Sequence, residues 1–300
     1  MKKGTFYITT PLYYVNDVAH LGHVFEVIGI DVQARFRRQT GHDVFFLSGT
    51  DEHGAKIQTE AEKRGIPPQK LIDRVAGAFI DLWKDLHISN DDFLRTSQKR
   101  HAKGVTELFK RLMEKGYIYK GQYEGWYCLP CETFWTKSQL KKNNRCPDCN
   151  RETTRQKEET YFFKLSEFQK PLLDLFEKNK TFVVPEIRRN EMLNSFLKPG
   201  LSDLCVSRTS ITWGITLPGD SAHVIYVWFD ALINYLTGVG FGTDEELFRK
   251  WWPADIHVVG KDILKFHTLI WPAMLLAGDI EPPKQVYGHG FVNIKDEKIV

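Results

Sequence analysis

Two histidines, His20 and His23, occur where a strand-like run gives way to a helical pattern. Residues 6–10 read as a strand and residues 21–39 as a helix, which places both imidazoles near the unpaired backbone N–H groups of a helix start. Imidazoles and N–H groups stabilise charge on a phosphate, and Gly22 between them permits close approach of the backbone. The H-x-G-H pattern of residues 20–23 indicates a nucleotide-phosphate site. Histidines that only cap a helix would give the same pattern.

Four cysteines form two C-x2-C pairs that fourteen residues separate: Cys128, Cys131, Cys146 and Cys149. This spacing is typical of a structural zinc site in which four thiolates surround the ion and leave no open position for catalysis. Two disulfides or spare thiols are the alternative, which the expected reducing compartment disfavours. Cys205 stands apart in an apolar run and is predicted to be a buried, inert thiol.

Polar or aromatic residues follow further predicted strands, at residues 44–47, 224–227 and 256–259. In an open α/β sheet, ligands bind at the carboxyl ends of the strands, so these loops are expected to converge on one site. Trp228 could line a pocket, and Asp262 after Gly260 could accept hydrogen bonds from ribose hydroxyls. Read alone, Trp228 could equally be a core residue and Asp262 a helix N-cap.

Length and composition describe a globular chain. The 300 residues, 42% of them hydrophobic, are enough for a sizeable core in one large or two medium domains. We find no apolar run of the roughly 18 residues that span a membrane and no apolar signal segment, so a cytoplasmic protein without membrane contact is expected. A net charge of +3 means that any contact with nucleic acid must be local.

The chain is predicted to have three parts. Residues 1–116 form the first half of a nucleotide-binding α/β domain, with helices at 55–64, 69–86 and 99–115. Residues 117–220 form a connective insertion with short strands, a zinc knuckle at about 126–150 and a helix at 186–197. Residues 221–300 resume the α/β pattern as the second half, with helices at 230–236 and 262–276.

Several motifs together resemble the class I methionyl-tRNA synthetases. In chain order they are Thr9–Asn16 leading into His20–His23, Gly49–Gly54, Ser207–Thr209, Val227–Ala231, and Gly260–Ile263 with Phe266–His267. The resemblance covers nearly the whole chain, and the cysteine pairs match the zinc-bearing connective insertion of that family. It implies an α/β fold with a Rossmann-like parallel sheet that this zinc-binding insertion splits.

The resemblance also implies roles for particular residues. It assigns catalysis to His20, His23 and Arg208, and ATP binding to His20, Gly22, His23, Gly260 and Asp262. It assigns methionine binding to Pro11, Leu12, Tyr14, Asp51, Trp228, Ala231, Tyr235, Ile263 and His267. Asp51 would hold the ammonium group, while the aromatic side chains would contact the thioether, each such contact being worth roughly 0.3–1.5 kcal/mol.

The implied activity is ATP-dependent formation of methionyl-adenylate, followed by transfer to the 2′-hydroxyl of the terminal adenosine of tRNA(Met). Structural Zn²⁺ and Mg²⁺ with ATP are the implied metals. A small-molecule nucleotidyltransferase of the same fold would need neither the tryptophan loop nor the knuckle. A non-catalytic zinc-bearing RNA-binding protein would explain the knuckle but not the strand-end loops.

Two departures from the family pattern are visible. The lysine-rich K-M-S-K-S-type loop would begin near residues 296–300, and no anticodon-binding domain follows. We therefore expect an incomplete catalytic region. In addition, Leu232 stands where many relatives have a proline beside the pocket.

Overall fold

The computed structural model of the chain describes residues 3–135, 137–294 and 297–298. The expected start of the lysine-rich loop, at residues 296–300, falls mostly on residues 296, 299 and 300, which lie outside the described residues. We find no helix among the described residues that is long and apolar enough to cross a membrane.

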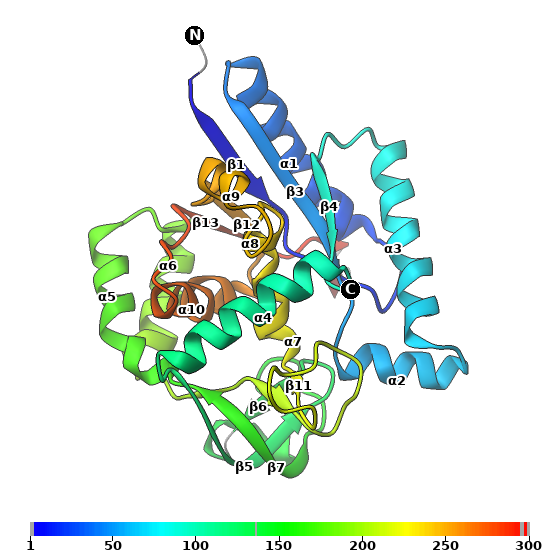
Figure 1. Cartoon of the computed structure of the whole chain (residues 1–300), viewed down its shortest axis with the longest axis vertical. Coiled ribbons are helices and arrows are strands. Elements are labelled where there is room, and N and C mark those ends of the chain that lie inside the picture. Colours follow the sequence, from blue (N-terminus) through cyan, green and yellow to red (C-terminus); the bar gives the residue numbers. More distant parts are fainter. Residues whose placement is uncertain (1–2, 136, 295–296, 299–300) are drawn as a thin grey trace.

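A parallel sheet forms the centre of the molecule (Figure 1). Its strands run in the order β2-β3-β1-β12-β13-β8, and β4 also pairs with β3. The strands are β1 (Thr5–Thr9), β2 (Tyr13–Tyr14), β3 (Asp43–Asp51), β4 (Asp92–Arg95), β8 (Val183–Val184), β12 (Ile256–Gly260) and β13 (Val286–His289). All their pairings are parallel, so the strand ends that precede the loops lie at one edge. The expected α/β fold with a Rossmann-like sheet is confirmed.

Helices cover both faces of the sheet. The helices of the described residues are α1 (Leu21–Gln39), α2 (Ala55–Arg64), α3 (Pro68–Asp85), α4 (Lys99–Glu114), α5 (Gln169–Lys178), α6 (Glu186–Met192), α7 (Val227–Leu232), α8 (Asn234–Thr237), α9 (Glu245–Trp251) and α10 (Trp271–Ala277). Short 3₁₀ or π turns are η1 (Lys137–Gln139), η2 (Lys142–Asn144), η3 (Leu165–Phe168), η4 (Leu193–Leu197) and η5 (Phe266–Ile270). The predicted helices at 21–39 and 55–64 have the expected bounds.

Side chains along β1 point alternately into two hydrophobic cores, one on each face of the sheet. Phe6 and Ile8 are buried with Val27 of α1 and with α3, whereas Tyr7 between them is buried on the opposite face. This is the two-residue period of a strand buried on both sides. Tyr7 donates a hydrogen bond to the carbonyl oxygen of Tyr235 at 2.8 Å, which ties the first strand to the last third of the chain.

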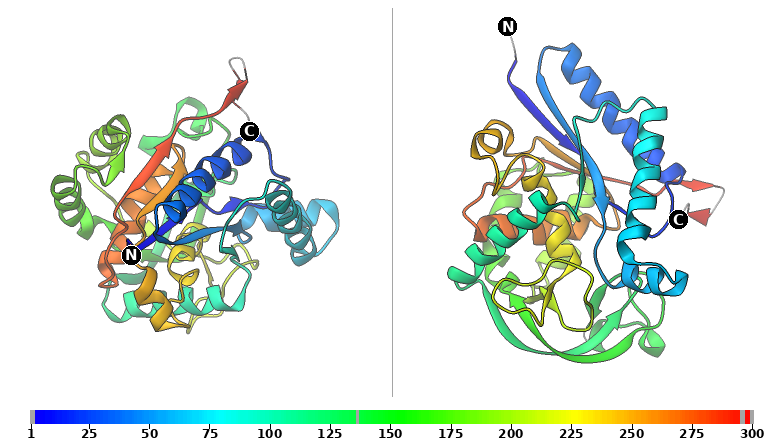
Figure 2. Two further views of the ribbon diagram at one scale, coloured as in Figure 1. Left: turned by 90° about the horizontal axis from the view of Figure 1, so that it is seen from above. Right: turned by 45° about the vertical axis from the view of Figure 1, so that its right-hand side comes forward.

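A second, antiparallel sheet forms the insertion. Its strands lie in the order β6-β5-β7-β9, namely β6 (Thr133–Trp135), β5 (Ile118–Cys128), β7 (Thr154–Phe163) and β9 (Leu204–Cys205). Figure 2 shows β5 and β7 as a long curved hairpin at the end of the molecule away from the N-terminus. Two small antiparallel pairs complete the described strands: β10 (Ser207–Arg208) with β11 (Val224–Ile225), and β14 (Asn293–Ile294) with β15 (Glu297–Lys298).

Two features differ from the sequence-based expectation. The strand expected at residues 224–227 is reduced to β11, which pairs with β10 outside the parallel sheet, and Trp228 lies in the first turn of α7. A short apolar run can form a strand or a buried helix, and here tertiary packing selects the helix. Conversely, β8 pairs with β13 in the main sheet although residues 183–184 fall in the range expected for the insertion. The division at residues 116 and 220 remains a prediction.

Candidate active site

A cavity of about 1010 Å³ lies where the loops after β1, β3, β12 and β13 meet. Its lining includes all the residues expected to bind ATP or methionine: Pro11, Leu12, Tyr14, His20, Gly22, His23, Asp51, Trp228, Ala231, Tyr235, Gly260, Asp262, Ile263 and His267. Cys131 and Cys149 of the cysteine pairs also reach it. The tertiary structure thus brings together residues from both halves of the sheet and from the insertion.

The two histidines are fixed by the start of α1. His20 is the N-cap, and its Nδ1 accepts the Gly22 N–H at 3.1 Å, while His23 Nδ1 accepts the His20 N–H at 3.2 Å. The rings stack with centroids 3.8 Å apart. Burial, and then the neighbouring His20, lower the pKa of His23 to about 4, so this ring is neutral at pH 7. Because each Nδ1 accepts, each neutral ring keeps Nε2–H as a donor suited to a phosphate oxygen.

Asp51 ends β3 as a buried carboxylate that faces the cavity. Its Oδ1 has no hydrogen-bond partner among the described residues. Burial, followed by the charges of Asp230 and Glu132, raises the pKa of Asp51 well above its ordinary value. A backbone hydrogen bond from His53 opposes this shift, but the unpartnered Oδ1 leaves the ionised carboxylate only partly compensated, so a cation in the cavity would stabilise it.

Aromatic side chains form the wall beside Asp51. Trp228 of α7 stacks on Phe266 with ring centroids 3.8 Å apart and an interplanar angle of 11°. His267 Nδ1 bonds to the Ile263 carbonyl oxygen at 3.0 Å, which requires a hydrogen on Nδ1, so Nε2 accepts from the Tyr235 hydroxyl at 2.7 Å. Burial lowers the pKa of His267 to about 4, so the imidazole is neutral and this wall carries no charge.

A glycine leaves space in the turn after β12. A Cβ on Gly260 would lie 2.6 Å from Asp262 Oδ1, so the Asp262 carboxylate occupies room that a larger residue would take. This turn lies beside Glu26 and His289, which sequence reasoning missed. His289 Nε2 contacts Glu26 Oε1 at 2.7 Å, and this contact raises the pKa of His289 despite the opposing effect of burial. No local sequence pattern marks His289 of β13 as a site residue, because its partner Glu26 is 263 residues away in the sequence.

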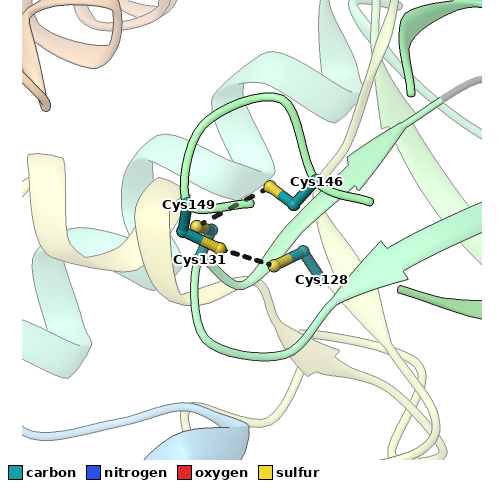
Figure 3. Close-up of side chains that lie close together, drawn as sticks. All are labelled: Cys128, Cys131, Cys146 and Cys149. Carbon is teal, nitrogen blue, oxygen red and sulfur yellow. Dashed lines mark hydrogen bonds between the residues drawn. The ribbon is translucent and has the colours of Figure 1, made fainter. Parts of the chain in front are cut away.

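The four predicted metal ligands come together at the edge of the cavity. The sulfur atoms of Cys128, Cys131, Cys146 and Cys149 all lie within 4.8 Å of one another, and Figure 3 shows them pointing toward a common centre. Two of the separations are 3.5 Å and 3.9 Å. Tetrahedral zinc–sulfur bonds of about 2.3 Å require sulfur atoms about 3.8 Å apart, so this set of thiols fits such an ion. The cluster could therefore hold a metal ion.

Arg208 does not line the cavity. Its guanidinium is buried over the rings of Phe134 and Tyr226, at 4.2 Å and 4.3 Å from their centroids, and donates to the Ser207 carbonyl oxygen at 2.7 Å. Arg208 lies in β10, which pairs with β11 outside the parallel sheet. The catalytic role expected of Arg208 remains a prediction.

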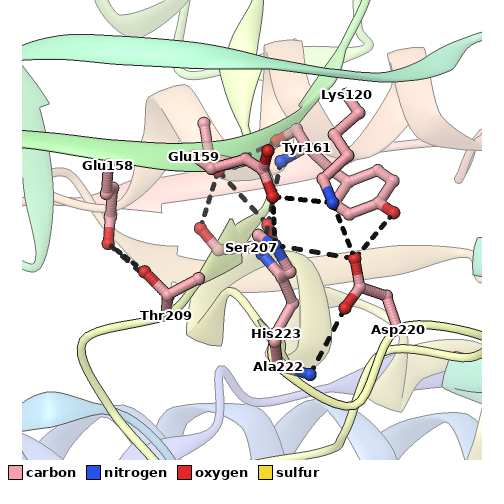
Figure 4. Close-up of polar contacts among 10 residues, drawn as sticks. Lys120, Glu158, Glu159, Tyr161, Ser207, Thr209, Asp220, Ala222 and His223 are labelled. Carbon is pink, nitrogen blue, oxygen red and sulfur yellow. Dashed lines mark hydrogen bonds and ion pairs between the residues drawn. The ribbon is translucent and has the colours of Figure 1, made fainter.

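A second group of possible metal ligands lies outside the cavity lining, within the expected insertion and just after it. It consists of Glu159, Asp220 and His223 (Figure 4). Lys120 Nζ lies 2.6 Å from a Glu159 oxygen and 3.0 Å from an Asp220 oxygen, and His223 Nδ1 bonds to Ser207 Oγ at 3.0 Å. The exposed Lys120 ammonium group thus balances the two carboxylates, and the group joins the β10–β11 pair to β5 and β7.

Comparison with known proteins agrees with this architecture. The family described as tRNA synthetases class I (M) matches residues 6–158 and 151–300. The chain belongs to this family of class I tRNA synthetases, as its motifs predicted.

Two relatives illustrate the similarity in sequence. The methionine–tRNA ligase of Clostridium tetani is 54% identical over 300 residues, which are 100% of this chain and 47% of that protein. The enzyme of the same name from Halalkalibacterium halodurans is 47% identical, over 99% of this chain and 47% of its own length. The chain therefore spans about half the length of these relatives.

Solved structures show the same fold. Mycobacterium tuberculosis methionyl-tRNA synthetase in complex with methionyl-adenylate has a TM-score of 0.95 and 43% identity, over 99% of this chain and 59% of that one. The free form of the same enzyme has a TM-score of 0.84 and 41% identity, over 96% of this chain and 56% of that one. The structure described here thus has the higher score against the adenylate complex.

Proposed function

We propose that this chain carries the catalytic site of a methionine–tRNA ligase. The reaction joins L-methionine to ATP to give methionyl-adenylate and then transfers methionine to the 2′-hydroxyl of the terminal adenosine of tRNA(Met), for translation in the cytoplasm. One observation carries the proposal: a single cavity joins the buried Asp51 carboxylate, whose Oδ1 has no partner among the described residues, and the aromatic wall to the stacked imidazoles at the start of α1.

Each group has a part in the first step. Asp51 accepts the methionine ammonium, which orients the carboxylate, while Trp228 and Tyr235 enclose the thioether. A carboxylate oxygen attacks the α-phosphorus, the bond from that phosphorus to the bridging oxygen breaks, and pyrophosphate leaves. His20 and His23 donate from Nε2–H to the α-phosphate oxygens as charge builds there. The protein thus acts by positioning and electrostatics.

Metal ions have two roles in the proposal. The four cysteines hold Zn²⁺ as a structural ion, because all four positions are thiols and none is open to substrate. Mg²⁺ would accompany ATP and balance the charge on the leaving pyrophosphate. The lysine-rich loop of the family would share that task.

Calorimetric titration of the chain with L-methionine tests the amino-acid site. We expect saturable binding of methionine, no comparable binding of leucine, isoleucine or cysteine, and loss of binding in Trp228→Ala. A folded, metal-loaded chain that fails to bind methionine would contradict the proposal. Salt-sensitive RNA binding without amino-acid binding would instead favour an RNA-binding protein.

The histidines are tested separately. His20→Ala and His23→Ala should each slow adenylate formation by roughly 10²- to 10³-fold, the usual effect of removing one such donor, with methionine affinity nearly unchanged. Pyrophosphate release in a single turnover measures the rate, and calorimetry measures the affinity. Equal loss of methionine binding would remove the assigned role. Adenylation of a different small molecule would favour a nucleotidyltransferase.

A further inference from the structure

Glu132 connects the cysteine turn to the opposite side of the cavity. It directly follows Cys131, is only 4% exposed, and lines the cavity. Its backbone has a positive φ of 48°, and its N–H donates to the Leu129 carbonyl oxygen at 3.2 Å. The turn that holds Cys128 and Cys131 therefore also fixes the position of the Glu132 backbone.

The carboxylate of Glu132 reaches the first half of the sheet. Oε1 accepts the backbone N–H of Lys56 at 2.9 Å, and Oε2 lies 3.2 Å from the hydroxyl of Tyr14. These partners are 76 and 118 residues away in the sequence. A Cβ on Gly54 would lie 2.7 Å and 2.8 Å from the two carboxylate oxygens, so the loop after Asp51 is shaped around this side chain.

The main chain of Glu132 contacts the start of α7. Its carbonyl oxygen accepts the hydroxyl of Tyr226 at 2.5 Å. Tyr226 is the N-cap residue of α7, the helix that carries Trp228 and Ala231. One residue of the cysteine turn is thus bonded to β2 and to the start of α7, which carry Tyr14, Trp228 and Ala231 of the expected methionine pocket. It is also bonded to the start of α2, which closely follows Asp51 in the chain.

We propose that Glu132 is a positioning residue through which the metal-holding turn and the methionine pocket are coupled. With an ion held by the cysteines, Glu132 is fixed and holds Tyr14, the Lys56 turn and Tyr226 in their binding positions. Binding at either site then favours binding at the other, because coupling between two sites is reciprocal. The inference rests on the proposed methionine site.

Glu132→Gln tests the coupling with little change in size. The amide oxygen can still accept the Lys56 N–H, and the amide NH2 can donate to the Tyr14 oxygen, whose own hydrogen can go to the His53 carbonyl oxygen at 3.0 Å. The substitution therefore replaces a carboxylate acceptor by a weaker neutral one, which corresponds to roughly three- to tenfold weaker methionine binding by calorimetry. Metal content, measured by atomic absorption, should stay at the wild-type level. Glu152→Gln, on an exposed glutamate after the second cysteine pair, is the matched control and should bind normally.

Metal removal distinguishes coupling from a merely structural role of Glu132. The measured quantity is the factor by which chelation weakens methionine binding, compared between the wild type and the variant. Chelation should weaken methionine binding in the wild type, and by a clearly smaller factor in Glu132→Gln. Tyr226→Phe, which leaves Glu132 intact, should also weaken methionine binding without loss of metal.

A double-mutant cycle with Tyr14→Phe should show that the effects of the Tyr14 and Glu132 substitutions do not add. Unchanged methionine affinity in Glu132→Gln, additive effects in the cycle, or an equal chelation factor in wild type and variant would each overturn the coupling. Absence of methionine binding in the wild type would instead overturn the proposed function.

Discussion

Asp51 shows that the site is organised for binding at a cost to stability. Its pKa is raised because the ionised carboxylate is buried near Asp230 and Glu132 without a cation of its own. A carboxylate whose pKa is higher in the folded state destabilises that state at any pH above its ordinary pKa. Methionine would relieve this by supplying an ammonium group.

Asp51→Asn should therefore separate binding from stability. We expect methionine affinity to fall by roughly 10- to 150-fold, the value of a hydrogen bond to a charged group. The melting temperature of the ligand-free chain at pH 7 should rise, by about 2–4 °C for each kcal/mol of relieved repulsion. Calorimetry and thermal unfolding measure the two effects, and a lower melting temperature would contradict this reading.

His267 predicts a pH dependence of stability. Its folded pKa of about 4 lies below its ordinary value of 6.5, so the unfolded state takes up the proton first. The free energy of unfolding therefore has its full contribution from the neutral ring above pH 6.5. This contribution is lost as the pH falls toward 4, by about 3 kcal/mol in total.

Thermal or urea unfolding between pH 4 and 7 measures this effect. His267→Gln should show a shallower fall than the wild type over this window. Parallel curves for wild type and His267→Gln would exclude the burial of a neutral His267.

At the scale of elements, the turn before α2 depends on a glycine. Gly54 has a φ of 102°, and an added Cβ would overlap the Glu132 carboxylate. Gly54→Ala should destabilise the chain by at least about 1–2 kcal/mol from the backbone conformation alone. Gly29→Ala is the control, since Gly29 is in the middle of α1 with open space around it, and it should stabilise by about 0.5–1 kcal/mol. Urea unfolding decides the sign of each change.

The cysteine turns should depend on their ion. Their backbone hydrogen bonds are few and local, so the four sulfur atoms provide the main link between residues 128–131 and 146–149. After chelation, amide hydrogen exchange in these turns should become at least about tenfold faster, while β1 and β12 stay protected. Uniform exchange across the chain before and after chelation would argue against metal binding there.

At the scale of the whole molecule, the two halves of the sheet share one core. Phe229 of α7 is fully buried and packs edge-on against Phe109 of α4, with ring centroids 5.4 Å apart. Phe229→Ala should lower the free energy of unfolding by about 3–5 kcal/mol. The chain should still unfold in a single transition that involves both halves, with a lower midpoint. Hydrogen exchange read separately in β3 and β13 checks this, and a loss of protection confined to β13 would show independent halves.

Much of this protein follows from local sequence. The strand before His20, the bounds of α1 and the paired cysteines were predictable because each depends on spacing within a few turns of chain. The family motifs then indicated most of the cavity lining. Local spacing and family motifs do not predict which side chain a buried charged residue contacts.

The tertiary structure alone decided the long-range contacts. Glu132 gained its partners, Glu26 met His289, and Arg208 was placed between aromatic rings instead of in the cavity. The short run at residues 224–227 became part strand and part helix because its partner was β10. Local spacing fixes which side chains share a helix face or a turn, whereas contacts across 76 to 263 residues exist only after the sheet and its insertion have packed together.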